Sequence, residues 1–346
     1  MLKNLKSTIN RELNKFLLDL DKKYSLQKTS PILFETIKDF MLREGKRIRP
    51  LLFVAGYLGY AKKSAKGLYQ SALSIELLHD FMLIHDDIID KSLVRRGRPT
   101  VHVMLNRYLR KFDNAKFNGQ DLAIITGDIM YAMAIRAFLS IDENMERKEQ
   151  ALKNFIDAAI YTGTGEFIEL IYGVKNINEI TKEEIYKVYD FKTAQYTFSS
   201  PLATGAILAG ADKKQVELLS KYGIYIGRAF QIKDDIIGMF SAEKDIGKSI
   251  LSDLKESKKT LLVWLGYNNS GKEDKVRIEK LLLCNNITMK DMLEMRALLE
   301  KTGALEKAKQ EIRILAKKAE TILNHVTMKP QYKNALSEFS FRTLGC

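Results

Sequence analysis

Cysteine and proline are scarce in this chain of 346 residues. The two cysteines, Cys284 and Cys346, form no close C-x-x-C pair. This excludes a disulfide framework and a thiolate zinc cluster, and it favours a reducing compartment. The five prolines leave long stretches without a helix breaker, which favours helices over strands and tight turns.

Long apolar runs are also missing. No stretch reaches the roughly 18 apolar residues that a membrane-spanning helix needs. The N-terminal residues 1–24 alternate charges and leucines at helical spacing and lack the apolar segment of a signal peptide. The terminal Leu344-Gly345-Cys346 is not a prenylation box, because no residues follow its cysteine. We therefore expect a cytoplasmic protein.

The charge balance is strongly basic. Lys and Arg number 56 against 43 Asp and Glu, a formal net charge of +13. Such a balance suggests an anionic partner, which is nucleic acid, an acidic membrane surface or a phosphorylated small molecule. Apolar residues still make up 46% of the chain, which is enough to build a core.

The periodicity of apolar residues is helical almost throughout. There is no alternation of strands and helices and no G-x-G-x-x-G after a strand, so a doubly wound nucleotide-binding fold is excluded. No Pro/Ser/Gly-rich linker divides the chain, and we expect a single all-α domain over residues 1–346. The expected helices cover residues 31–42, 50–60, 71–90, 121–140, 149–171, 182–210, 214–239, 259–267, 275–284, 288–302 and 304–325.

Aspartates interrupt two of these apolar helices with a similar pattern. The first is IHDDIID at 84–90, and the second is IKDDIIG at 232–238. Burying an unpaired carboxylate is costly, so each motif requires a cationic partner. Asp86 and Asp90 are four residues apart and therefore lie about 40° apart around a helix axis, on one face. Two such helices facing each other would gather several carboxylates around one cavity.

Carboxylates without clustered cysteine or histidine are the preference of Mg²⁺ rather than zinc. Mg²⁺ binds one or two carboxylates and completes its shell with water and substrate phosphates. Basic residues lie close to both motifs, in KSLVRRGR at 91–98, in GKRIRP at 45–50 and at Lys248 and Lys258. Because arginine suits bidentate capture of phosphate oxygens, the pattern predicts several Mg²⁺ ions bridging a diphosphate.

These segments together resemble the trans-isoprenyl diphosphate synthases, which are head-to-tail prenyltransferases. The resemblance runs from about residue 40 to 262. It implies the all-α isoprenoid synthase type I fold, a large helical bundle with a central cavity, and a homodimer. The matching stretches are GKRIRP (45–50), HDDIIDKSLVRRGRPTVH (85–102), Gly127-Asp128, YDFKTAQYTFSSPLATGAILAG (189–210), GRAFQIKDDIIGMF (227–240) and DIGKSILSDLKESKKT (245–260).

The resemblance also implies a role for each matched residue. The metal ligands are Asp86 and Asp90 for two Mg²⁺ ions on the allylic diphosphate and Asp234 for a third, with Asp87 and Asp235 assisting. The allylic diphosphate is contacted by Arg95, Lys192, Lys248 and Lys258, and isopentenyl diphosphate by Lys46, Arg49, His79 and Arg96. Thr193 and Gln231 line the cavity near the reacting carbons. The catalytic set is Asp86, Asp87, Asp90, Arg95, Lys192 and Asp234.

The implied reaction needs no protein nucleophile, in line with the lack of a Ser-His-Asp or Cys-His arrangement. Mg²⁺ and cationic side chains stabilise the charge that grows on the leaving diphosphate, so that its C–O bond ionises. The double bond of isopentenyl diphosphate then attacks the allylic cation. Loss of a proton, which the family ascribes to the departed diphosphate, gives a product five carbons longer.

The chain departs from the family pattern at three positions. Glu44 stands where a second glycine often precedes GKR, Glu169 stands where an aspartate is usual, and Gly238 ends the second motif. Because a glutamate replaces the usual aspartate at position 169, we assign Glu169 no role. Many members share the DDxxG ending, so we expect activity despite Gly238.

Product length depends on what blocks the growing tail beside the first motif. Phe81 occupies the fifth position before the motif, where an aromatic residue limits elongation in the family. Phe81 and Met82 lie about 6–8 Å below Asp86 along a helix. This floor favours geranylgeranyl diphosphate (C20), with farnesyl diphosphate (C15) as the alternative.

Other functions fit the sequence less well. A class I terpene cyclase would need a second motif that the residues at Gly238 and Ala242 do not supply. A basic scaffold or nucleic-acid-binding protein would gather its basic residues on one face with aromatic platforms, whereas here they lie near the aspartates. A catalytically silent subunit of a heteromeric prenyltransferase remains an alternative, although such subunits usually lose an aspartate motif.

Overall fold

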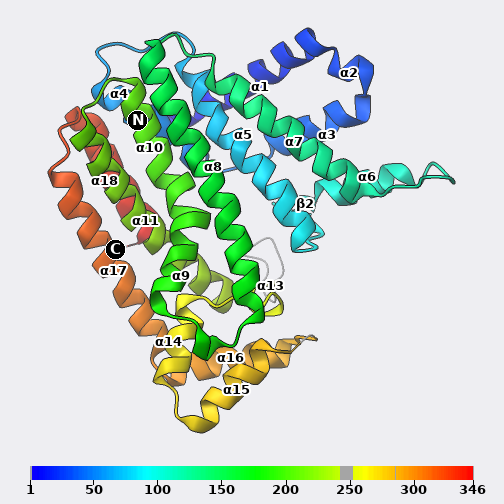
Figure 1. Cartoon of the computed structure of the whole chain (residues 1–346), viewed down its shortest axis with the longest axis vertical. Helices are drawn as coiled ribbons and strands as arrows, with labels where there is room; N and C mark the ends of the chain where they lie inside the picture. The colour runs from blue at the N-terminus through cyan, green and yellow to red at the C-terminus, as the bar shows by residue number, and fades with distance from the viewer. Residues whose placement is uncertain (1, 242–251, 285, 346) are drawn as a thin grey trace. The chain divides into compact units, whose positions relative to one another are not determined.

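The computed structural model describes residues 2–241, 252–284 and 286–345 and is almost entirely helical there (Figure 1). The prediction of an all-α fold is confirmed. The chain divides into two compact units, one of residues 1–152 with 204–210 and one of residues 153–203 with 211–346. The single domain over residues 1–346 stays a prediction. No helix within the described ranges is long and apolar enough to cross a membrane.

The first unit is built around two long helices, α5 and α7, which run side by side (Figure 1). Gly127 of α7 permits this close approach, because a Cβ atom there would lie 2.5 Å from Nε2 of His85 on α5. The elements of this unit are α1 (Leu2–Tyr24), α2 (Leu26–Thr29), α3 (Pro31–Leu42), α4 (Ile48–Tyr60), α5 (Leu68–Ile89), β1 (Val94–Arg95), β2 (Arg98–Pro99), α6 (Val101–Leu109) and α7 (Gly119–Phe138), with the start of α8 (Met145–Val174) and the end of α10 (Ser200–Leu208).

In the second unit, α11 packs against α17 and against the segment η2, and holds the second aspartate motif. This unit comprises the rest of α8, η1 (Ile177–Glu179), α9 (Lys182–Tyr189), η2 (Asp190–Ser199), the start of α10, α11 (Lys213–Phe240), α13 (Ser252–Lys255), α14 (Leu261–Asn269), α15 (Lys272–Leu282), α16 (Met289–Lys301), α17 (Ala304–Asn324) and α18 (Pro330–Leu344).

Local sequence explains where several helices begin. Asn118 precedes α7 and accepts hydrogen bonds from the backbone N–H groups of Gln120 and Asp121 at 2.7 and 3.2 Å. The Asp121 carboxylate accepts the Asn118 N–H in return at 2.8 Å. Such a capping box satisfies N–H groups that lack a partner within the helix.

Residues 190–199 form a π-helix between α9 and α10. The predicted helix over 182–210 is therefore present, but with a wider central segment. π-helical turns are rare and occur mostly at functional sites. This one carries Lys192 and Thr193.

Candidate functional site

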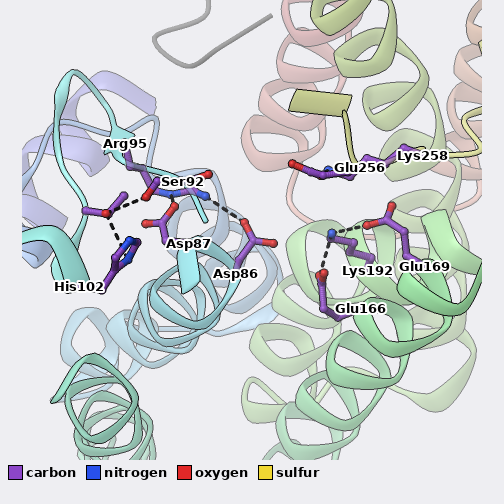
Figure 2. Close-up of polar contacts among 11 residues, drawn as sticks. Asp86, Asp87, Ser92, Arg95, His102, Glu166, Glu169, Lys192, Glu256 and Lys258 are labelled. Carbon is purple, nitrogen blue, oxygen red and sulfur yellow. Dashed lines mark hydrogen bonds and ion pairs between the residues drawn. The ribbon is translucent and has the colours of Figure 1, made fainter. Parts of the chain in front are cut away.

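The first aspartate motif forms the last turn of α5. Asp86 and Asp87 both accept hydrogen bonds from Arg95, at 2.9 Å from Nη2 to Asp86 Oδ2 and at 2.7 Å from Nε to Asp87 Oδ1 (Figure 2). Asp87 is fully buried. Burial raises the pKa of its carboxyl to about 6, although Arg95 opposes the shift. Asp90 is half-buried and caps the helix.

Arg95 belongs to a short hairpin that follows the motif. Its strands pair Val94 with Pro99 and Arg95 with Arg98. The two turn residues, Arg96 and Gly97, have φ angles of 54° and 70°, as in the type I′ turn that suits the twist of a hairpin. The turn thus directs Arg95 and Arg96, which are neighbours in sequence, to different partners.

A buried arginine fixes this hairpin to α3. Arg43 pairs with Asp39, with Nη2 2.7 Å from Oδ2, and the same guanidinium donates to the Arg95 and Pro99 carbonyls at 3.3 and 2.7 Å. Asp39 also accepts Arg98 Nη1 at 2.6 Å. No role was expected for Arg43 or Asp39 from the sequence. Both hold the strands that position Arg95.

The predicted isopentenyl-site residues surround the start of α4. Lys46 is exposed, Arg49 is half-buried, and the Arg96 guanidinium lies against Gly45, where a Cβ atom would meet Nη1 at 3.5 Å. Burial first, and then Arg49 and Arg96, hold the pKa of His79 well below its usual value. The first unit therefore gathers Lys46, Arg49, His79 and Arg96 in one region.

Arg47, which separates Lys46 from the rest of this group, has a structural role. It adopts the left-handed conformation with φ of 52° and is 4% exposed. Its guanidinium donates to Glu76 Oε1 at 2.7 Å, to Asn10 Oδ1 at 3.1 Å and to two carbonyl groups. Its donors thus hold the turn between α3 and α4 against α1 and α5.

Two further carboxylates were not singled out from the sequence. Glu76 and Asp80 lie one turn apart on α5 and are almost fully buried. The sequence pattern could have identified them, because both interrupt the same apolar helix as the aspartate motif and have the same spacing of four residues.

Phe81 packs between two aromatic rings. Its centroid lies 4.7 Å from that of His85 and 5.2 Å from that of Tyr131 on α7. Met82 is half-buried beside it. Tyr131 was not foreseen, because the pairing of α5 with α7 is not visible in the sequence.

In the second unit, Lys192 lies between two glutamates of α8. Its Nζ atom is 2.7 Å from Glu166 and 2.5 Å from Glu169 (Figure 2). Glu169 is the departure from the family pattern that received no role. Its side chain is nevertheless an ion-pair partner of the predicted catalytic lysine.

A chain of hydrogen bonds joins the other predicted residues of this unit. Thr193 Oγ1 donates to Gln231 Oε1 at 2.6 Å, and Gln231 Nε2 donates to Asp235 Oδ1 at 2.9 Å. The Tyr189 hydroxyl donates to the other oxygen of Asp235 and accepts the Leu261 N–H at 2.7 Å. Burial and Asp235 raise the pKa of Tyr189 well above its usual value. The chain links the π-helix to α11 and to the start of α14.

The two aspartates of the second motif have different environments. Asp234 is exposed, whereas Asp235 is 7% exposed and held by Tyr189 and Gln231. Asp234 is therefore the more accessible candidate ligand, and Asp235 anchors the helix.

Lys258 and Lys259 follow α13. Lys258 pairs with Glu256 at 2.5 Å (Figure 2). Lys259 is buried, its Nζ donates to the Gly173 and Ser257 carbonyls at 2.8 Å each, and burial lowers its pKa to about 8. The remaining predicted phosphate ligand, Lys248, lies outside the described residues.

Comparisons with known proteins show the family of the chain. The family model of polyprenyl synthetases matches residues 30–299. Geranylgeranyl diphosphate synthase of Sulfolobus acidocaldarius is 32% identical over 318 residues, which cover 90% of this chain and 91% of the relative. Geranylfarnesyl diphosphate synthase of Aeropyrum pernix is 31% identical over 287 residues, which cover 82% of this chain and 84% of that one.

A solved structure extends the likeness to almost the whole chain. Geranylgeranyl pyrophosphate synthase from Corynebacterium glutamicum, complexed with isoprenyl diphosphate and magnesium, matches with a TM-score of 0.89 at 27% identity over 99% of both chains. The family model covers well over half of the present sequence. The chain therefore belongs to the polyprenyl synthetase family and is a prenyltransferase.

Proposed function

We propose that the protein condenses isopentenyl diphosphate with an allylic diphosphate in a head-to-tail reaction. The observation that carries the proposal is the end of α5, where Asp86 and Asp90 share one helix face beside the hairpin of Arg95 and Arg96. Carboxylates next to an arginine-rich turn suit a metal-bridged diphosphate.

Basic residues form the two proposed diphosphate sites, and aspartates form the proposed Mg²⁺ sites. Isopentenyl diphosphate binds at Lys46, Arg49, His79 and Arg96, and the allylic diphosphate binds near Arg95, Lys192, Lys248 and Lys258. Asp86, Asp90 and Asp234, assisted by Asp87 and Asp235, hold about three Mg²⁺ ions, a donor set of carboxylate oxygens that suits this ion. Bound Mg²⁺ supplies Lewis-acid stabilisation of the leaving diphosphate.

The side chains of the protein perform the remaining tasks. Arg95, Lys192 and Lys258 neutralise charge on the leaving oxygen, which lowers the barrier to breaking the allylic C–O bond. The isopentenyl double bond forms the new C–C bond, and the departed diphosphate takes up the proton whose loss restores the alkene. Thr193 and Gln231, which hydrogen-bond each other, orient the reacting carbons.

We propose geranylgeranyl diphosphate as the product. The stacking of Phe81 between His85 and Tyr131 supports a floor at this depth. Relatives of similar identity have different product names, geranylgeranyl and geranylfarnesyl diphosphate synthase, so product length needs a direct measurement.

We also propose a homodimer, formed through α8, and a cytoplasmic location. Exposed apolar side chains follow one face of α8 at intervals of three and four residues, an apolar seam typical of helix pairing. They are Ile156, Ile160, Phe167, Leu170 and Val174, and Gly163 on the same face has no heavy atom within 4 Å of its Cβ position. Such a seam would be covered by the same seam of a second copy.

The test is incubation of the purified protein with Mg²⁺, labelled isopentenyl diphosphate and dimethylallyl, geranyl or farnesyl diphosphate, followed by chromatographic sizing. A C20 product that disappears with EDTA is expected, and Asp86→Ala or Asp234→Ala should lower turnover by orders of magnitude while the circular dichroism stays unchanged. A C15 product would correct the length. No product with any primer from a folded sample would favour the silent subunit, and wild-type rates in either variant would exclude the metal assignment.

A further inference from the structure

Asp80 is a buried carboxyl group for which the proposed reaction has no use. It is 0% exposed, and neither carboxylate oxygen has a hydrogen-bond partner in the described part of the chain. Glu76, one turn earlier, is 2% exposed and accepts Arg47 through one oxygen, while its other oxygen also lacks a hydrogen bond in these ranges. An acidic pair without full compensation is costly, so its presence beside a phosphate site requires a reason.

The surroundings of Asp80 combine opposing influences. Burial and then Glu76 favour its neutral form, whereas Arg96, Arg47 and Arg49 favour the carboxylate. Burial dominates, and it raises the pKa of Asp80 to about 8. The free protein therefore carries a proton on Asp80 at neutral pH and releases it at mildly alkaline pH.

The other elements packed against α5 place their polar groups elsewhere. On α1, Asn10 is an uncharged partner of Arg47. On α7, Asp128 lies 3.7 Å from His85, and Tyr131 stacks on Phe81. On α3, Asp39 pairs with Arg43, and on α6 the buried His102 has its Nδ1 3.3 Å from the Thr100 hydroxyl. The arginines at the start of α4 and in the hairpin are therefore the groups that decide the ionisation of Asp80, together with Glu76.

We propose that Asp80 is a positioning residue that must be neutral while isopentenyl diphosphate is bound at Lys46, Arg49 and Arg96, so that in alkaline solution, where its carboxylate forms, binding draws a proton back onto it. The inference rests on the function proposed above. It assigns to the buried acid the task of releasing the arginines to the diphosphate.

Asp80 affects ligand binding through its charge. An ionised Asp80 competes with the ligand for Arg49 and Arg96, since all of these groups share a region of low dielectric constant. A bound diphosphate adds negative charge and draws on the same guanidinium groups, so it disfavours the Asp80 carboxylate. The carboxylate then binds one proton from solvent and becomes a neutral acid. By linkage, binding must weaken where that proton is scarce.

The experiment is titration calorimetry of the full chain with isopentenyl diphosphate at pH 8.5–9, in two buffers of different ionisation enthalpy. The ligand phosphate, with its second pKa of about 6, is fully ionised in this range. We expect wild-type protein to take up roughly 0.5–1 proton per chain, and its Kd to rise by up to tenfold per pH unit, the limit for one linked proton. In Asp80→Asn the uptake should vanish and the Kd should stay level.

A matched control is Asp142→Asn, which removes an exposed carboxylate of the same unit. It should retain the wild-type proton uptake. Comparing the wild type with Asp80→Asn is also needed because Lys259 has a pKa of about 8. Proton uptake by Lys259 would persist in Asp80→Asn. The Kd values of wild type and Asp80→Asn should lie closest at pH 6.5, where both side chains are neutral.

The outcomes separate the inference from the proposed function. Binding of isopentenyl diphosphate without proton uptake, or uptake that persists in Asp80→Asn, would overturn the role of Asp80 and leave the function intact. Failure of isopentenyl diphosphate to bind, with inorganic pyrophosphate bound and more protons taken up by the wild type than by Asp80→Asn, would overturn the substrate and retain the role of Asp80. Failure of both ligands to bind a folded sample would overturn both.

Discussion

Carboxylates on α5 are stabilised by different means at successive turns. Glu76 accepts a hydrogen bond from Arg47, and Asp87 accepts one from Arg95. Asp80 has no such partner among the described residues. Burial raises its pKa, so it stays neutral by keeping its proton. A single helix therefore contains acids that are paired with an arginine and one acid that is protonated. Only the acids near its end lie at the proposed metal site.

The pKa of Asp80 predicts how stability depends on pH. The folded protein keeps the proton up to about pH 8, whereas the unfolded chain releases it near the usual aspartate pKa of 3.8. Unfolding therefore releases a proton between these values, so Asp80 makes the free energy of unfolding fall as pH rises through this window. In urea titrations from pH 5 to 8.5, the free energy of unfolding of Asp80→Asn should fall less steeply with pH than that of the wild type. Parallel curves for the two proteins would mean that Asp80 is ionised throughout.

Phe81 gives a prediction about specificity. Replacing it with alanine opens the space between His85 and Tyr131 and should lengthen the product by five or more carbons, which chromatography of the reaction products measures. Phe81→Tyr keeps the ring and should keep the wild-type length. An unchanged product in Phe81→Ala would shift the floor to Met82, to the buried Leu78 about one turn earlier on α5, or to another helix.

The sequence was sufficient to propose the candidate site residues, because their order and spacing are distinctive. It was not sufficient to divide their tasks. Arg47 is chemically identical to Arg49, and only its buried contacts with Glu76 and Asn10 reveal a structural role. The Lys192 pairing with Glu169 likewise depends on how α8 and η2 pack, which no local pattern encodes.

At the scale of elements, two glycines set the distance between α11 and the neighbouring η2 segment. A Cβ atom on Gly227 would lie 2.4 Å from Cα of Ala194, and one on Gly223 would lie 2.5 Å from Cα of Ser199. This close approach keeps Gln231 within hydrogen-bonding distance of Thr193. Backbone contact between the elements thus supports the geometry of their polar side chains.

Gly227→Ala should therefore disturb both packing and activity. The added methyl group forces α11 away from η2, which we expect to lower the free energy of unfolding by about 1–3 kcal/mol and to reduce kcat through loss of the Thr193–Gln231 contact. Gly271→Ala is the control, because Gly271 lies outside the proposed dimer seam and nothing lies within 4 Å of its Cβ position. Gly271 is the N-cap residue of α15, so this variant should lose no more than about 1 kcal/mol. Equal stabilities of the two variants in urea unfolding would refute the packing argument.

Most long helices were predictable because their apolar periodicity is strong. The hairpin, α6 and α18 were not predicted. The hairpin has strands of two residues each, too short for an alternating pattern. α6 is a short helix of nine residues that lies between the expected helices at 71–90 and 121–140. The π-helical form of residues 190–199 was also not foreseen, because its side-chain pattern resembles that of an ordinary helix.

At the scale of the whole molecule, the exposed seam of α8 argues that the single chain is not the final assembly. Phe167 is 66% exposed and Val174 is 81% exposed. Contiguous exposed apolar surface marks interaction sites in folded proteins.

We expect the protein to have about twice the mass of the 39.6-kDa chain in light scattering. Phe167→Glu introduces charge into the seam and should shift the mass toward that of one chain. Leu293→Glu is the control, since Leu293 is also exposed, at 55%, but lies on α16. A dimer that survives Phe167→Glu, or a monomeric wild type, would contradict assembly through α8.

The turn of the hairpin has a consequence for engineering this protein. Arg96 has a φ of 54°, at a position where asparagine or glycine is favoured and where an arginine costs conformational energy. The proposed phosphate contact requires the arginine nevertheless. A selection for heat resistance alone would therefore favour loss of this side chain, and stabilised variants of the protein need to be screened for catalysis at every round.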